Sequence, residues 1–382
     1  MPDGCICAPA AERGRLPFPF AAPARRLTSR SEGRFFAEEL LVPDVLFDAL
    51  VPLGWDDRVA ALWSTIDVAD AVPARVVRVE RSACVVAAPD GDHVARAPTL
   101  PAVGDWVALL DDAVVGMVER WSSLARGDPM GEHQVLAANL DFVFVTAPAD
   151  RLRAARVDRE VAMAWEGGAR PIVLVTKADL ADGPEVEALR ERLVGVDVVA
   201  TSGVTGEGVD ALSDMLRPHR TAALLCPSGA GKSTLANGLL GEDRLAVGDV
   251  RAGDHRGRHT TTSRQLVVVQ AGGVLVDTPG LRSLALVSGD GVAAAFADIE
   301  ALGEGCRFGD CLHDLEPGCA VVAAAEAGAL DGSRLASYRK LLREVAFEER
   351  KADPRARKEQ VRVWKARTKA VRRQQKDRGR DQ

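Results

Sequence analysis

The sequence predicts an α/β fold with a small β-barrel ahead of it and a metal-binding helical region behind it. Three observations carry this prediction. Apolar strands alternate with helical windows from Leu140 onward, which is typical of a mostly parallel sheet covered by helices. Five short β-like runs fall within residues 73–121. Three cysteines and a histidine crowd into residues 306–319.

Length and composition agree with a multidomain globular protein. The chain has 382 residues, of which 47% are hydrophobic and 27% charged, enough for two to three domains. No run of about 18 apolar residues exists, and the N-terminus lacks the pattern of a secretory signal. Seven cysteines in this length do not make a disulfide scaffold. We therefore expect a cytoplasmic, monomeric protein without a membrane anchor.

The charge of the chain is distributed unevenly. The formal net charge is −6, but residues 355–382 carry twelve Arg/Lys against three Asp/Glu, so this tail is locally +9 and the rest sums to −15. A basic tail on an acidic body indicates a polyanionic partner. The alternative is a solvated helix without a partner.

Lysine is nearly absent before the tail. The first 339 residues contain 31 arginines and only two lysines, Lys177 and Lys232. Where arginine serves almost everywhere else, a lysine indicates that a compact ammonium on a flexible stem is needed.

The elements follow in a clear order. Residues 1–40 are rich in Pro, Ala, Arg and Gly and are expected to be disordered, and a short helical lead-in is expected through Val59, Leu62 and Trp63. Strands are predicted at 74–80, 83–88, 93–97, 105–110 and 114–120, and then at 141–146, 171–176, 197–201, 222–226, 265–269 and 274–276. Helices are predicted at 154–167, 184–194, 207–216, 232–240 and 333–350.

Residues 222–235 predict a phosphate-binding loop between a strand and a helix. The loop contains Gly229, Ala230, Gly231, Lys232 and Ser233 in a variant of the pattern G-x-x-x-x-G-K-[ST], with cysteine at position 226 where the pattern has glycine. Backbone N–H groups from Gly229 to Thr234 can wrap a phosphate at the helix N-terminus. Lys232 would reach the β- and γ-phosphates, and Ser233 would bind Mg²⁺. Ser228 belongs to the same loop.

A second motif indicates guanine as the base. Thr176-Lys177-Ala178-Asp179 ends a strand, and the Asp179 carboxylate can accept two hydrogen bonds from the guanine edge while the lysine stem lies along the base. Adenine would present the wrong donors, so GTP is favoured over ATP. Ser202 and Gly203, after the next strand, could pack against the base.

Two further segments predict the switch elements of a GTPase. Asp277 in Asp277-Thr278-Pro279-Gly280 would hold Mg²⁺ through water, and the Gly280 N–H would face the γ-phosphate. Upstream, Thr261 or Thr262 would offer its hydroxyl to Mg²⁺. Leu281 stands where many GTPases have a glutamine that orients the attacking water. His255 and His259 are therefore candidates for that task, with phosphate contact or solvation as the alternative.

Cys306, Cys311, His313 and Cys319 form the ligand set of a closed, tetrahedral zinc site. Because all four positions are filled by protein, the metal is expected to be structural rather than catalytic. RNA contact through Arg75, Arg78, Arg81 and Arg96 is predicted for the barrel, against the alternative of a barrel face that binds nothing.

The order of the motifs is unusual, because the base-reading segments precede the phosphate loop and the D-x-x-G segment comes last. In this order the chain resembles the small-ribosomal-subunit biogenesis GTPases of the RsgA (YjeQ-type) family over residues 55–350. Residues 103–107, 134–139, 257–262 and 277–281, the cysteine spacing, and Glu316-Pro317-Gly318-Cys319 carry the resemblance. The family has Gly at position 226 and Asn at position 176.

The resemblance implies an OB-fold, a circularly permuted P-loop GTPase core and a C-terminal zinc-binding helical domain, in that order. The boundaries that we expect are 1–72 for the extension and lead-in, 73–125 for the OB-fold, 126–297 for the GTPase domain, 298–350 for the zinc domain and 351–382 for the basic tail. The implied cofactors are GTP as substrate, Mg²⁺ and one structural Zn²⁺. The implied partner is the small ribosomal subunit with its rRNA, which would stimulate GTP hydrolysis in late subunit assembly. The remaining alternatives are a non-catalytic, GTP-gated RNA-binding module and a P-loop ATPase or nucleotide kinase.

Overall fold

The computed structural model describes residues 47–80, 82–127, 133–180, 183–227, 229–241, 264–277, 284, 286, 288–314 and 316–352. These residues all belong to one compact unit, Pro43–Gln382. The expected disorder of residues 1–40, and all of the predicted basic tail 351–382 beyond residue 352, lie outside the described residues. Within the described part of the chain, no helix is long and apolar enough to span a membrane.

The first part of this unit is the predicted five-stranded barrel. Its strands are β1 (Val72–Val79), β2 (Cys84–Ala88), β3 (Gly91–Ala95), β4 (Trp106–Leu110) and β5 (Ala113–Met117). Strand β1 pairs with both β2 and β4, β4 pairs with β5, and a parallel bridge between Arg96 and Ala113 joins the end of β3 to the start of β5. This closure confirms the expected OB-type barrel.

The helical lead-in is also confirmed and covers one end of the barrel. It consists of a 3₁₀ helix η2 (Asp48–Leu53) and helix α1 (Asp57–Trp63). The Asp56 side chain caps α1 by accepting a hydrogen bond from the Val59 N–H at 2.9 Å. Leu50 and Val59 pack with the fully buried Trp106 of β4 in a separate apolar cluster.

The burial of Arg75 contradicts one prediction about the barrel. We expected this side chain to contact RNA, but it is only 1% exposed. Its guanidinium donates to the Leu53 and Gly104 carbonyls and, at 2.9 Å, to the Thr221 hydroxyl at the start of the core sheet. Burial lowers its pKa to about 10, and the charge remains because so many acceptors surround it. Arg75 is therefore a structural link and not a surface cation.

The core sheet has the strand order expected of a permuted GTPase. Its strands are β8 (Phe142–Pro148), β9 (Arg170–Thr176), β10 (Asp197–Thr201), β11 (Thr221–Leu225), β12 (Arg264–Val268) and β13 (Val274–Asp277). The spatial order is β10-β9-β8-β11-β13-β12, with parallel pairing except between β12 and β13. Because the carboxyl ends of parallel strands meet at one edge, this order brings segments distant in sequence together there.

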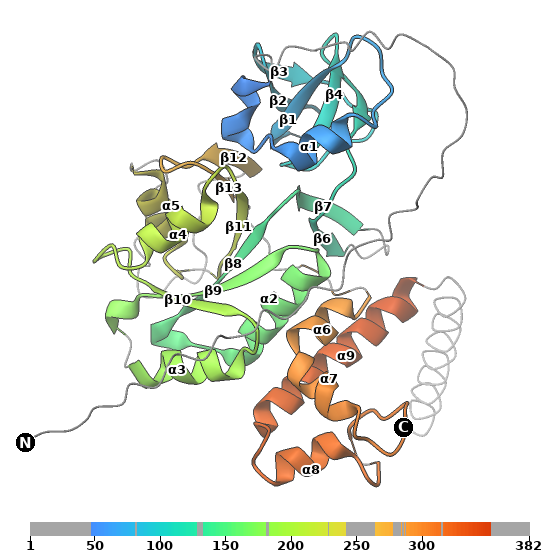
Figure 1. Ribbon diagram of the computed structural model, residues 1–382, viewed down its shortest axis with the longest axis vertical. Coiled ribbons are helices and arrows are strands. Elements are labelled where there is room, and N and C mark those ends of the chain that lie inside the picture. Colours follow the sequence, from blue (N-terminus) through green and yellow to red (C-terminus); the bar gives the residue numbers. More distant parts are fainter. Residues whose placement is uncertain are drawn as a thin grey trace, which may run out of the picture. The chain divides into compact units, whose positions relative to one another are not determined.

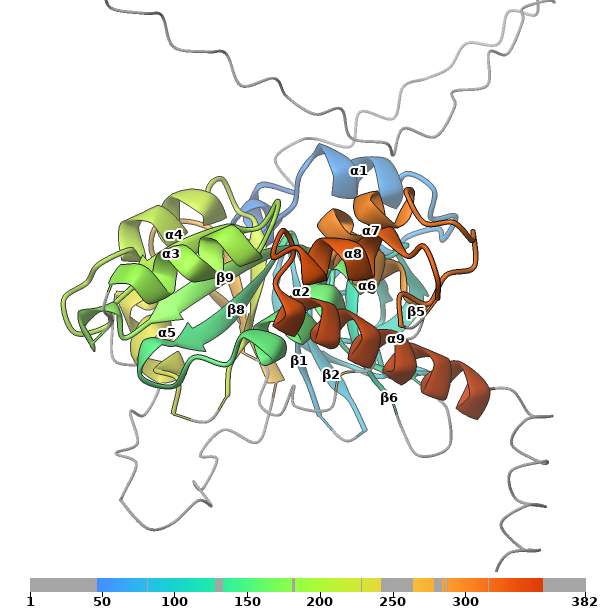
Figure 2. The same cartoon turned by 90° about the horizontal axis from the view of Figure 1, so that it is seen from below.

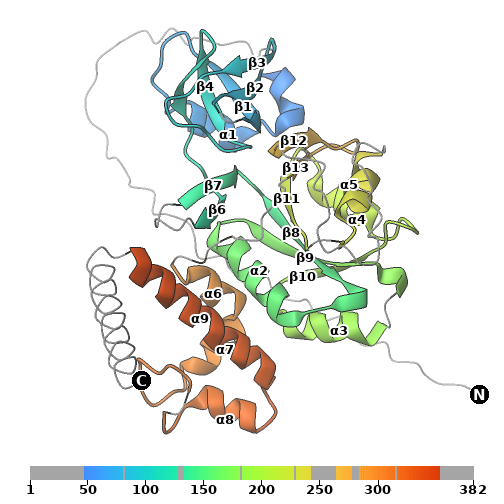
Figure 3. The same cartoon turned by 180° about the vertical axis from the view of Figure 1, so that it is seen from behind.

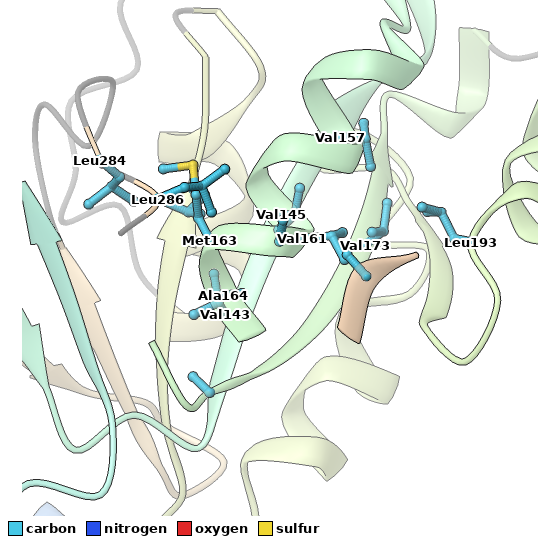
Figure 4. Packing of buried hydrophobic residues seen from close by; sticks show 14 of the residues in the cluster. Val143, Val145, Val157, Val161, Met163, Ala164, Val173, Leu193, Leu284 and Leu286 are labelled. Carbon is cyan, nitrogen blue, oxygen red and sulfur yellow. The ribbon is translucent and has the colours of Figure 1, made fainter. Parts of the chain in front are cut away.

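Helices cover both faces of this sheet (Figures 1 and 3). Helices α2 (Ala154–Glu166) and α3 (Gly183–Arg192) pack on one face, and α4 (Val209–Leu216) and α5 (Lys232–Leu240) on the other. Alternate residues of each strand point to opposite faces of the sheet and pack in two separate apolar cores. Val143 and Val145 face α2, whereas Phe142 and Phe144 face α4 and α5. Figure 4 shows the first core, with Val143, Val145 and Val173 of the strands against Val157 and Val161 of α2.

The remaining helices gather around one long helix, α9 (Gly332–Ala352), as Figure 2 shows. They are α6 (Asp290–Ala295), α7 (Ala297–Gly303) and α8 (Ala320–Glu326). Helix α2 contacts both α6 and α9. Phe296, Ile299, Val321 and Leu341 therefore belong to the same apolar core as the strands β8 and β9.

Five of the described strands and α-helices were not predicted. Strands β6 (Ser123–Gly127) and β7 (His133–Ala138) form a separate two-stranded sheet between the barrel and the core. Helices α6, α7 and α8 each have only six or seven residues. Such short helices complete fewer than two turns, so their sequences show no reliable period of 3.6 residues.

Candidate functional site

The predicted phosphate loop lies between β11 and α5. All five residues of β11 are buried, and α5 begins at Lys232. Gly229 (φ +71°) and Gly231 (φ +82°) both adopt the left-handed conformation that favours glycine. The loop can therefore turn tightly enough for successive N–H groups to face one point, which is how backbone amides bind a phosphate. Ser228 lies outside the described residues.

Lys232 and Asp277 meet across this loop. Asp277 ends β13 and is 5% exposed, and its carboxylate forms an ion pair with the Lys232 ammonium. Lys232, which is predicted to contact the β- and γ-phosphates, thus lies beside Asp277, which is predicted to hold Mg²⁺. Ser233 and Thr234 follow on the first turn of α5 and are half-buried.

Thr176 joins the base-reading segment to the phosphate loop. Its side chain is 4% exposed at the end of β9, and its hydroxyl donates a hydrogen bond of 2.8 Å to the Ala230 carbonyl. The two residues are 54 positions apart in the chain. An asparagine amide could donate in the same way, so threonine supplies here a donor that asparagine has in the family.

Asp179 and Ser202 also lie together, although 23 positions separate them. The Ser202 hydroxyl donates to the Asp179 carboxylate at 2.6 Å, while Ser202 itself is fully buried. Asp179 is exposed in the 3₁₀ helix η4 (Ala178–Leu180), so its free lone pairs can meet a ligand. The structure therefore brings these two predicted base-binding side chains together.

Gly203 allows the segment after β10, which contains Ser202, to lie close to α5. A Cβ at this position would lie 2.4 Å from the Thr234 Cγ2 atom, far inside van der Waals contact. Only glycine leaves room for this approach. The segments around residues 176, 202 and 230 are consequently held at one edge of the sheet.

One residue near the site was missed in the sequence. Asp150 follows β8 in the 3₁₀ helix η3 (Ala149–Arg151), and its carboxylate pairs with the Lys177 ammonium at 2.7 Å. Lys177 has a left-handed backbone (φ +58°) and a side chain that is one-third exposed. An acidic residue directly after a strand of the same parallel sheet was the available signal.

The cysteine at position 226 lies against buried polar groups. Burial raises the pKa of its thiol to about 11, so the thiol stays protonated at neutral pH, and it hydrogen-bonds with Thr146. Thr146 is fully buried and donates to the Leu225 carbonyl at 3.1 Å. Nearby, burial raises the pKa of Glu160 to about 7, although Arg156 pairs with it at 3.0 Å. The thiol is thus a small, neutral substitute for the usual glycine.

The other predicted site residues fall outside the described residues. These are His255, His259, Thr261, Thr262 and Gly280, together with Leu281. Of the predicted nucleotide-site residues that the structure describes, all lie on the segments that meet at the carboxyl edge of the sheet.

Cys306, Cys311, His313 and Cys319 converge as the sequence predicted. Their ligand atoms all lie within 4.8 Å of one another. The Cys306 and Cys319 sulfurs are 3.8 Å apart, and each is 3.5 Å from Nδ1 of His313. A tetrahedral zinc ion with Zn–S of about 2.3 Å and Zn–N of about 2.0 Å requires separations of about 3.8 Å and 3.5 Å. The residues therefore fit zinc, which His313 would bind through Nδ1.

Helix α9 supports this cluster from outside. Arg339 donates to the main-chain carbonyl of His313, whose backbone is left-handed (φ +57°). Glu316 accepts hydrogen bonds from the N–H groups of Leu312 (3.1 Å) and Asp314 (2.8 Å), which fixes the loop that carries His313. Such contacts orient metal ligands before the metal binds.

The strand order and the loop between β11 and α5 define a circularly permuted P-loop nucleotide-binding protein. The family model described as RsgA GTPase matches residues 117–287. Among curated relatives, the Small ribosomal subunit biogenesis GTPase RsgA of Streptomyces coelicolor is 44% identical over 342 residues, covering 84% of this chain and 93% of the relative. The protein of the same name from Streptomyces avermitilis is 44% identical, covering 83% and 91%.

Two solved structures share the fold. The crystal structure of YjeQ from Thermotoga maritima superimposes with a TM-score of 0.55 at 23% identity and covers 72% of this chain and 99% of its own. The structure of YloQ, a circularly permuted GTPase, gives 0.52 at 23% identity and covers 73% and 96%. The chain belongs to the RsgA GTPase family, and it is a GTP hydrolase.

Proposed function

We propose that this protein hydrolyses GTP while bound to the small ribosomal subunit and acts in the late assembly of that subunit. The hydrogen bond from Thr176 to Ala230 carries the nucleotide part of the proposal, because it joins the base-reading segment to the phosphate loop. The ribosomal part is supported by the curated relatives named small ribosomal subunit biogenesis GTPases.

The proposed guanine site consists of four residues: Lys177, Asp179, Ser202 and Gly203. Asp179 accepts from the guanine N1–H and N2–H groups, and Ser202 holds that carboxylate in place. Lys177 lies along the base, and Gly203 allows the second segment to close on it. An adenine edge offers no such pair of donors to a carboxylate.

The phosphates are proposed to bind the N–H groups of residues 229–234, including Gly229, Gly231 and Thr234. Lys232 compensates the negative charge of the β- and γ-phosphates. Ser233 and Asp277, with Thr261 or Thr262, would hold Mg²⁺, which withdraws charge from the phosphates when bound. Gly280 would donate its N–H to the γ-phosphate.

The group that orients the attacking water is proposed to be His255 or His259. Position 281 is leucine, which cannot hydrogen-bond water. A neutral imidazole can accept a proton at physiological pH. We therefore expect slow hydrolysis by the protein alone and faster hydrolysis on the subunit, whose binding would position the histidine that orients the water.

Contact with rRNA is proposed for the basic tail from residue 355 to 380. Its arginines and lysines would bind phosphates without sequence preference, through release of counterions. Truncation after Pro354 should leave GTP binding intact and weaken subunit binding. Equal subunit affinity of both proteins across salt concentrations would contradict this role.

Single-turnover GTP hydrolysis with and without purified small ribosomal subunits tests the proposal directly. We expect stimulation by subunits, and loss of it in His255→Ala or His259→Ala. A parent protein that subunits do not stimulate would refute the ribosomal part. If both variants keep full stimulation, another group must orient the water.

A further inference from the structure

The segment that follows Asp277 is anchored in the core by two leucines. Leu284 lies seven positions after Asp277 and is 3% exposed, and Leu286 is fully buried. Figure 4 shows both beside Met163 of α2. The position of Leu284 therefore fixes the C-terminal end of the stretch that begins at Asp277.

Arg159 of α2 holds this anchor and helix α9 at the same time. Its Nη2 donates to the main-chain carbonyl of Leu284 at 2.9 Å. Its Nε lies 3.1 Å from each carboxylate oxygen of Glu344 on α9. Both charged side chains are 28% exposed, so the pair is partly shielded from solvent. A planar guanidinium fixes the directions of both contacts, which a lysine could not do.

Two other contacts hold the same segment without including α9. An antiparallel bridge joins Leu284 to Arg126 of β6. The Glu166 carboxylate of α2 accepts from the N–H groups of Ser288 and Gly291. The contact through Arg159 differs from these because its second partner, Glu344, moves with α9.

Helix α9 also reaches the metal cluster, through the bond from Arg339 to the His313 carbonyl. Arg339 and Glu344 lie about one and a half turns apart on this helix. A displacement of the zinc-binding region that shifts α9 would therefore pull on the Glu344 carboxylate, and Arg159 would transmit it to the Leu284 carbonyl.

We infer that Arg159 is a positioning residue that couples α9 to the segment downstream of Asp277, and thereby sets the geometry of the GTPase switch. The inference rests on the GTPase function proposed above. Its prediction is that loosening the Arg159–Glu344 contact disturbs hydrolysis without disturbing guanine or phosphate binding, because neither residue belongs to the nucleotide site.

The test compares Glu344→Ala and Arg159→Lys with Tyr338→Phe in the full-length protein. Tyr338 is the matched control, because its hydroxyl joins α9 to Glu300 of α7 at 2.7 Å and does not touch Arg159. Hydrogen exchange is measured on a peptide covering residues 284–286, together with the single-turnover rate at saturating GTP and the Kd for GTP.

We expect faster exchange of this peptide and about a tenfold lower turnover rate in Glu344→Ala and Arg159→Lys. The Kd should remain that of the parent, and Tyr338→Phe should change none of the three. Unchanged exchange in both test variants, faster exchange without loss of turnover, or an equal effect of Tyr338→Phe would overturn the inference. A parent protein that does not hydrolyse GTP would refute the proposed function instead, and unchanged exchange would still overturn the coupling.

Discussion

The Thr176 hydroxyl and the Ala230 carbonyl are joined by a buried hydrogen bond of 2.8 Å. This bond connects the end of β9 to the middle of the phosphate loop. We therefore expect binding of the base and binding of the phosphates to be coupled, because the same short contact fixes both segments.

Replacement of Thr176 by valine should weaken GTP binding. The variant keeps the volume of the side chain but leaves the buried Ala230 carbonyl without its donor, which costs about 1–3 kcal/mol. We expect the Kd for GTP to rise about 5- to 150-fold, measured by titration with a fluorescent GTP analogue. Thr201→Val is the matched control: Thr201 is also buried at a strand end, but its hydroxyl contacts the Val175 carbonyl at 3.4 Å and not the phosphate loop. A similar loss in both variants would contradict a specific role for Thr176.

Asp179→Asn should reduce the affinity for GTP and improve that for xanthosine triphosphate. The amide no longer accepts from both guanine donors, but its NH₂ group can donate to the extra carbonyl of xanthine. Competition titrations with GTP, XTP and ATP give the order of preference. If the affinity for GTP is unchanged, Asp179 does not contact the base.

The cluster of Cys306, Cys311, His313 and Cys319 should bind one zinc ion per chain. Elemental analysis of the purified protein is the measurement, and less than half an equivalent of any metal would refute the prediction. Cys319→Ser should release the metal and unfold the region around residues 298–345, because metal binding and local folding are coupled. GTP binding should survive, since the nucleotide site lies on other elements.

Glu160→Gln should stabilise the protein at alkaline pH. Burial raises the pKa of Glu160 from 4.5 to about 7, so the folded state keeps a proton that the unfolded chain loses. The parent therefore loses stability as the pH rises between about 4.5 and 7, by at most about 3 kcal/mol. The neutral amide abolishes this loss. The measurement is the free energy of unfolding in urea at pH 5 and at pH 8. Glu187→Gln is the control: Glu187 forms an exposed ion pair on α3, so this variant should show no pH-dependent gain in stability.

Much of the core and of the site could be predicted because each motif coincides with a strand end. The phosphate loop, Thr176, Asp179 and Ser202 all follow apolar runs, and parallel strands bring such positions to one edge. The cysteine spacing likewise predicted a cluster whose distances suit zinc. Both predictions depend only on residues close together in the sequence, namely a motif beside a strand end and the spacing of the metal ligands.

Arg75 and Asp150 show where this reasoning stops. Arginine on a barrel strand is normally exposed, but Arg75 lies where several main-chain carbonyls from distant segments converge, and only the tertiary fold creates that environment. Asp150 gains significance only through Lys177, which is 27 positions away. Helices α6 to α8 were missed because packing against one another and against α2 and α9, rather than sequence period, stabilises them.

The pairing of β1 with β12 has a consequence for the boundaries of the barrel. Arg78 and Val79 of β1 are hydrogen-bonded partners of Gln265 and Arg264, so β12 of the core sheet has a neighbour on both sides. A protein shortened by removal of the barrel would expose an unpaired strand edge at β12, and such edges join to those of other molecules. The barrel thus also protects the core from self-association.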